Sequence, residues 1–177
     1  MTYFLILLYF CHHKHFKMAS NIEIERKYTV KDTDFLSENY KSEKIVQGYL
    51  STDPERVVRV RIKGDKGFIT IKGKSSISGT SRLEWEKEIS VTEVMDLIPL
   101  CLPGVINKTR YIVPYKNQEF EVDVFYGENE GLVIAELELK TEDQQIELPS
   151  WIGAEVTHDA RYYNAYLTTN PYTTWEK

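Results

Sequence analysis

Hydrophobic and polar residues alternate along most of the chain from Asn21 onward, which is the period-two pattern of a strand with one apolar and one polar face. In residues 22–28, every second residue is a glutamate or a lysine, and those between are mostly isoleucine or tyrosine. The pattern predicts eight strands, at residues 21–28, 45–50, 56–63, 67–74, 81–89, 107–113, 119–125 and 132–140. Turn-forming sequences at residues 52–54 and 64–67 indicate an antiparallel sheet with hairpin connections.

Helical patterns are few. Short helices are predicted at residues 32–40, 91–97 and 161–167. The second of these follows Ser90, a favourable N-terminal cap, and ends before Pro99. No linker, internal repeat or long low-complexity tract divides the chain, so residues 18–177 are expected to form one domain.

The first 17 residues differ from the rest of the chain, because an apolar run at residues 3–10 is followed by a histidine-rich tract. The run is shorter than the ~20 residues that a membrane-spanning helix needs. It also lacks the basic start and the cleavage site of a signal peptide. Residues 1–17 are therefore interpreted as an upstream or disordered extension before a natural start at Met18, and no membrane partner is expected. The alternative is a metal site formed by Cys11, His12, His13 and His15.

The overall charge argues against one class of function. The formal net charge of the 177 residues is −5, whereas proteins that bind nucleic acid usually present a basic surface. Two cysteines are too few for a disulfide-stabilised secreted fold. A cytoplasmic protein with no nucleic-acid partner is therefore expected. The sequence leaves the oligomeric state open and allows a homodimer.

Charges on the polar faces of the strands are sorted by sign, whereas a solvated surface usually mixes them. The basic positions are Arg59, Arg61, Lys63, Lys72, Arg82, Lys108 and Arg110, and the acidic positions are Glu23, Glu25, Glu121, Asp123, Glu136 and Glu138. A sheet whose charged face lies in water is the simplest explanation of the alternation alone. Eight antiparallel strands are also enough to close a barrel, and closure would bring these charges together in its lumen.

A lumen of this kind indicates a particular chemistry. Clustered carboxylates bind Mg²⁺ or Mn²⁺ through oxygen, and arginine and lysine bind phosphate groups. A lumen that contains both can hold a polyanion beside a divalent metal, which is the arrangement used in phosphoryl transfer.

Eight short motifs follow one another along the chain. The first is the ExExK form at residues 23–27, which is unspecific alone. The others are QGYL at 47–50, VRVR at 58–61, TIK at 70–72, RLEWE at 82–86, KTRY at 108–111, FEVDVF at 120–125 and AELEL at 135–139. In this order the motifs resemble those of the CYTH, or triphosphate tunnel metalloenzyme, superfamily. Residues 151–164 resemble the family's C-terminal segment, so the resemblance covers residues 21–167. It is closest to the small bacterial inorganic triphosphatases.

The resemblance implies a mainly β fold, an eight-stranded antiparallel closed barrel with a few flanking helices, and metal-dependent hydrolysis of tripolyphosphate to pyrophosphate and phosphate. It assigns Lys27, Glu25 and Arg59 to catalysis. The role implied for Lys27 is to orient or to activate the attacking water. As a base, Lys27 would need a lowered pKa, which cationic neighbours favour. The implied ligands of Mg²⁺ or Mn²⁺ are Glu23, Glu25, Glu84, Glu86, Asp123, Glu136 and Glu138. The implied triphosphate-binding residues are Arg59, Arg61, Lys72, Arg82, Lys108, Arg110 and Arg161.

One position departs from the family pattern, because Ala160 stands where a basic residue is expected, with His158 nearby as a substitute cation. Other functions remain open at this point. The same fold would serve a class IV adenylate cyclase or a thiamine or nucleoside triphosphatase. A non-catalytic polyphosphate-binding module would need no metal ligands, and a plain β protein would keep its charges in solvent.

Overall fold

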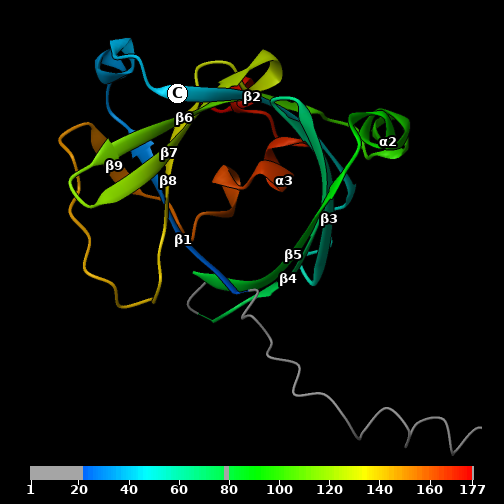
Figure 1. The fold of residues 1–177 in the computed structure, drawn as a ribbon, viewed down its shortest axis with the longest axis horizontal. Helices are drawn as coiled ribbons and strands as arrows, with labels where there is room; N and C mark the ends of the chain where they lie inside the picture. The colour runs from blue at the N-terminus through cyan, green and yellow to red at the C-terminus, as the bar shows by residue number, and fades with distance from the viewer. Residues whose placement is uncertain (1–21, 78–79, 177) are drawn as a thin grey trace, which may run out of the picture.

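The computed structural model describes residues 22–77 and 80–176, which one curved sheet dominates (Figure 1). The expected extension at residues 1–17, with its alternative metal site, lies outside the described residues. The strands are β1 (Ile22–Val30), β2 (Lys41–Ser51), β3 (Arg56–Lys63), β4 (Lys66–Ser75), β5 (Ser81–Ile89), β6 (Ile106–Tyr115), β7 (Gln118–Tyr126), β8 (Val133–Glu138) and β9 (Ile152–Glu155). Their order is β5-β4-β3-β2-β6-β7-β8-β1-β9.

Strand β1 closes the barrel. Its residues 22–24 pair with β5, and its residues 25–29 pair with β8, both antiparallel. Strands β1 to β8 therefore form the closed antiparallel barrel that the resemblance to the CYTH motifs implied. The sequence did not predict β9, which is only four residues long and pairs with β1 at Tyr28 and Val30.

The helices are short. The predicted helix at 91–97 is confirmed as α2 (Val91–Leu97). It begins with a capping box, in which the side chains of Ser90 and Glu93 each accept a hydrogen bond from the other's backbone amide. The other two helix predictions are wrong in extent, because tertiary packing rather than helix propensity shapes these segments. The 3₁₀ helices are η1 (Asp34–Ser37), η2 (Ile98–Leu100), η3 (Gly127–Asn129), η4 (Ala160–Tyr162) and η5 (Tyr172–Thr174), and α3 (Asn164–Leu167) is a single turn. No helix in the described part of the chain is long and apolar enough to cross a membrane.

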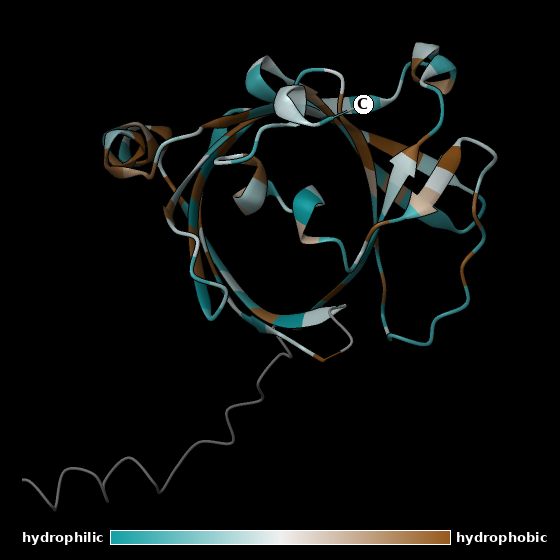
Figure 2. Cartoon of the chain, turned by 180° about the vertical axis from the view of Figure 1, so that it is seen from behind, coloured by the Kyte–Doolittle hydropathy of each residue, from teal (hydrophilic) through white to brown (hydrophobic). Residues whose placement is uncertain are grey.

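The apolar faces of the strands point out of the barrel, and one side of this exterior is covered. Tyr28, Phe120 and Leu137 of the barrel wall pack with Trp151 from the segment that follows β8. Phe35 of η1 stacks on Trp151, with 4.2 Å between the ring centroids. Figure 2 shows hydrophobic and hydrophilic residues alternating along the strands of the ring. This exterior core therefore fixes which face of β1, β6, β7 and β8 turns inward.

The charged faces point into the barrel, so the alternative of a solvated charged face is wrong. Lys108 and Asp123 are 3% and 1% exposed, and charged side chains are buried to this degree only when they are paired. At one end the interior is apolar, because Leu167 of α3 packs with Tyr49 and Phe125. Figure 1 shows α3 within the ring of strands. The C-terminal segment therefore fills one end of the barrel and leaves a charged interior beside it.

Candidate active site

A cavity of about 890 Å³ lies in the charged interior of the barrel. Among the described residues, nine basic and six acidic side chains line it, so its wall is net positive and suits a polyanion. The basic residues are Lys27, Arg59, Arg61, Lys63, Lys72, Lys74, Arg82, Lys108 and Arg110, and the acidic residues are Glu23, Glu25, Glu84, Glu121, Glu136 and Glu138. Most of the residues predicted from the sequence are thus brought together around one cavity.

Lys108 and Arg110 on β6 share the carboxylate of Asp123 on β7. Arg110 donates to both oxygens of Asp123, at 2.7 and 2.6 Å, and the Lys108 ammonium lies 2.5 Å from Oδ2. Burial raises the pKa of Asp123, but Arg110 and Lys108 outweigh it and hold this pKa below its usual value. Burial also lowers the pKa of Lys108 to about 8, which Asp123 offsets only in part. Asp123, a predicted metal ligand, does not line the cavity and instead lies behind two cations that do.

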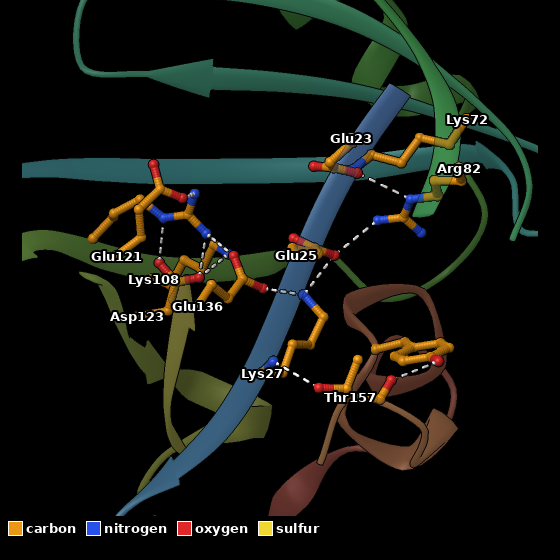
Figure 3. Close-up of polar contacts among 12 residues, drawn as sticks. Glu23, Glu25, Lys27, Lys72, Arg82, Lys108, Glu121, Asp123, Glu136 and Thr157 are labelled. Atoms are coloured by element: carbon orange, nitrogen blue, oxygen red, sulfur yellow. Dashed lines mark hydrogen bonds and ion pairs between the residues drawn. The ribbon is translucent and has the colours of Figure 1, made fainter. Parts of the chain in front are cut away.

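Lys27 is held in its charged form. Its ammonium lies 2.9 Å from Glu25 and also forms an ion pair with Glu136 (Figure 3). Burial lowers the pKa of Lys27, but the two carboxylates outweigh burial and raise this pKa above its ordinary value. A lysine in this state is a poor proton acceptor at neutral pH. Lys27 is thus held as a cation between two carboxylates, rather than beside the cations that would lower its pKa.

Two pairs of carboxylates lie directly opposite each other across neighbouring strands. Glu25 on β1 faces Glu138 on β8, and Glu121 on β7 faces Glu136 on β8. Like charges in this position repel each other. Burial raises the pKa of Glu121, and Arg110 offsets only part of this effect.

These opposed carboxylates fit a divalent cation. Carboxylate oxygen is the donor type that Mg²⁺ and Mn²⁺ prefer, and a cation between the pairs would relieve their repulsion. In the parts of the chain that the structure describes, no three acidic, histidine or cysteine side chains are already gathered around one metal position. Glu25, Glu121 and Glu136 instead contact protein cations, and Lys27 lies between Glu25 and Glu136.

The other two predicted ligands that line the cavity, Glu23 and Glu84, also contact cations. Glu23 accepts hydrogen bonds from Lys72 at 2.9 Å and from Arg82 at 3.0 Å (Figure 3). Lys72 lies 2.5 Å from Glu84, and Arg82 also donates to Glu25 at 3.1 Å. This cluster ties together β1, β4 and β5, where the barrel closes.

Besides Asp123, two further predicted site residues do not line the cavity. Glu86 contacts Arg61, at 3.0 Å, and Thr70 rather than the cavity. The Arg161 side chain is 60% exposed and lies 2.5 Å from Asp159. Asp159 is only two residues away and also accepts from the Arg161 amide, so local pairing holds Arg161 outside. Ala160 does line the cavity, which leaves this part of the wall without a cation.

Sequence reasoning missed several residues that line the cavity. Lys63, Lys74 and Glu121 continue charged faces already recognised, but no role was assigned to them. Tyr49 lies opposite Arg59 in the register, and its place in the QGYL motif on an inward face was the available signal. Thr157 bonds the Lys27 amide at 3.0 Å. Nothing in the sequence indicated this contact, because it depends on how the C-terminal segment enters the barrel.

Comparison with known proteins agrees with this geometry. The family model described as the CYTH domain matches residues 21–164. An inorganic triphosphatase from Acetivibrio thermocellus is 47% identical over 151 residues, which are 85% of this chain and 95% of that protein. An inorganic triphosphatase from Nitrosomonas europaea is 38% identical over 149 residues, which are 82% of this chain and 95% of that protein.

Solved structures show the same fold. The crystal structure of an inorganic triphosphatase matches with a TM-score of 0.62 at 35% identity, and the match covers 82% of this chain and 93% of that one. The chain belongs to the CYTH family, because the family model and these relatives cover most of its length. The resemblance seen in the motifs and the closed barrel are both confirmed.

Proposed function

We propose that this protein hydrolyses inorganic triphosphate to pyrophosphate and phosphate. One observation carries the proposal: the barrel encloses a net-positive cavity in which cations face opposed pairs of carboxylates. The charged residues of this cavity all lie within the segment that matches the family. The relatives named inorganic triphosphatase support the choice of substrate.

The proposed cofactor is Mg²⁺ or Mn²⁺. Glu25, Glu136 and Glu138 would hold the ion, with Glu23 and Glu121 beside them on the same inner wall. When bound, a divalent ion neutralises charge on phosphate oxygens and lowers the pKa of a coordinated water. Lys27 would orient Glu25 and Glu136, since it pairs with both.

The cations that line the cavity would hold the phosphate chain. Arginine suits this role because its planar fork can bind two phosphate oxygens. The proposed contacts come from Arg59, Arg61, Lys72, Arg82, Lys108 and Arg110. Attack of water on a terminal phosphorus breaks one P–O–P bond and releases phosphate, and the cations retain the pyrophosphate product.

Product analysis separates this function from its rivals. Purified protein is incubated with tripolyphosphate, pyrophosphate or ATP, each with and without Mg²⁺ or Mn²⁺. We expect metal-dependent release of phosphate from tripolyphosphate, with little turnover of pyrophosphate. Cyclic AMP from ATP would instead identify a cyclase, and binding without turnover of any of the three would identify a polyphosphate-binding module.

A further inference from the structure

One row of side chains crosses three neighbouring strands on the inner face of the barrel. Arg59 on β3 lies opposite Thr70 on β4, which in turn lies opposite Glu86 on β5. Thr70 is completely buried. Its hydroxyl donates to Glu86 Oε2 at 2.6 Å and accepts from Arg59 Nη2 at 3.2 Å. The hydroxyl therefore links the arginine to the carboxylate.

The same carboxylate also holds a second arginine. Arg61 Nη2 lies 3.2 and 3.0 Å from the two oxygens of Glu86, and the Arg61 guanidinium lies 5.6 Å from the centre of the Phe68 ring. Glu86 is 3.6 Å from Arg59 Nη2. One anion thus lies between two guanidinium groups that would otherwise repel each other.

Both arginines face the cavity, whereas the groups that hold them do not. Arg59 and Arg61 line the cavity, but Thr70 and Glu86 are not part of its wall. The Nε atoms of both arginines are buried without a hydrogen-bond partner in the described structure. Both oxygens of Glu86 are engaged by protein donors. This arrangement leaves the arginines with unused donors and leaves Glu86 with little capacity to bind a metal.

We propose that Thr70 and Glu86 are positioning residues that fix Arg59 and Arg61 for binding of the phosphate chain, and that Glu86 is not a metal ligand. The proposal rests on the proposed function. Two guanidinium groups that are already fixed lose less conformational freedom on substrate binding than two mobile side chains would. Their positions also match a polyanion more specifically than two mobile cations would.

The test separates positioning from metal binding. The variants Thr70→Val and Glu86→Gln are compared with wild type for KM, kcat and the Mg²⁺ concentration that gives half-maximal rate. Thr70→Val removes the hydrogen bonds that link Arg59 to Glu86 and should raise KM about tenfold. Glu86→Gln should have a larger effect because two arginines lose their anion. The half-maximal Mg²⁺ concentration should stay within about twofold of wild type in both variants. Thr70→Ser, which keeps the hydroxyl, should restore KM.

Matched controls come from the same barrel. Thr109 is also buried, and its hydroxyl accepts from Tyr126 rather than holding an arginine. Glu88, on the same strand as Glu86, pairs with Lys66 at the surface. Thr109→Val and Glu88→Gln should leave KM unchanged. An unchanged KM in Thr70→Val, or a large rise in the Mg²⁺ requirement of Glu86→Gln at unchanged KM, would overturn the proposal.

Binding in the absence of metal keeps this test independent of turnover. Tripolyphosphate is titrated into each variant in the presence of EDTA and followed by calorimetry. Weaker binding by Thr70→Val than by wild type supports the positioning role, even if the wild-type protein proves unable to hydrolyse tripolyphosphate. Equal affinities, or no binding by wild type, contradict it.

Discussion

Replacing Glu136 by glutamine is expected to lower kcat/KM for tripolyphosphate by about a thousandfold, since the substitution removes one proposed metal ligand and its charge. Glu136 also pairs with Lys27 and lies 2.5 Å from Arg110. Burial raises the pKa of Glu136, but these cations outweigh it and hold the pKa well below its usual value. Glu136→Gln should therefore also lower the free energy of unfolding by about 3 kcal/mol, because two buried cations lose a charged partner. Phosphate release and denaturant unfolding measure the two effects.

Glu138→Gln is the matched control for this experiment. Glu138 lies opposite Glu25 and lines the cavity, but it is exposed rather than buried between cations. We expect this variant to need more Mg²⁺ or Mn²⁺ for activity and to unfold within about 0.5 kcal/mol of wild type. A Glu136→Gln protein that keeps wild-type activity would contradict the metal assignment. A Glu138→Gln protein that is strongly destabilised would show that the ion pairs do not explain the stability effect.

The conservative change Arg110→Lys is expected to lower kcat/KM by about a hundredfold and the free energy of unfolding by about 3 kcal/mol. Arg110 binds both oxygens of Asp123 and also contacts Glu121 and Glu136. A lysine ammonium is a single point charge and cannot reach these acceptors together. In the variant, three carboxylates would be less completely neutralised. Steady-state kinetics would measure the change in kcat/KM, and thermal unfolding would measure the loss of stability.

Arg161→Lys provides the control for a change of arginine to lysine. Arg161 is exposed, pairs with Asp159 and does not line the cavity, so kcat/KM should stay within about twofold of wild type. A large loss of activity in Arg161→Lys would show that Arg161 contributes to substrate binding. An Arg110→Lys protein with wild-type kinetics would contradict the role of the buried guanidinium fork.

Much of the fold could be predicted from the sequence because the period of two survives along each strand of the barrel. The residues of β1 show this well, since Glu23, Glu25 and Lys27 all line the cavity. Strand β9 could not be predicted in this way, because four residues carry too little alternation and depend on pairing with β1. The segment at residues 32–40 was predicted as a helix, but only Asp34–Ser37 form a 3₁₀ turn there, with Phe35 stacked on Trp151.

The sequence indicated which charges face the lumen but not which charges pair. Lys27 was expected to act as a base beside other cations, yet the register places Glu136 directly opposite it. The resemblance placed Asp123 and Glu86 among the metal-ligand candidates, and in the structure both contact arginines. Alternation fixes the face of a residue, whereas its partner depends on strand register and barrel curvature. Arg161 shows the same limit, since a nearby Asp159 holds it outside.

The central claim is that the charged cavity of this barrel hydrolyses tripolyphosphate. The most direct measurement is the initial rate of phosphate and pyrophosphate formation from tripolyphosphate with Mg²⁺, made in parallel on wild type and Glu25→Gln. Wild type should form the two products in equal amounts, and Glu25→Gln should be at least about a hundredfold slower. No phosphate release by wild type with either Mg²⁺ or Mn²⁺, or equal rates for the two proteins, would contradict the account.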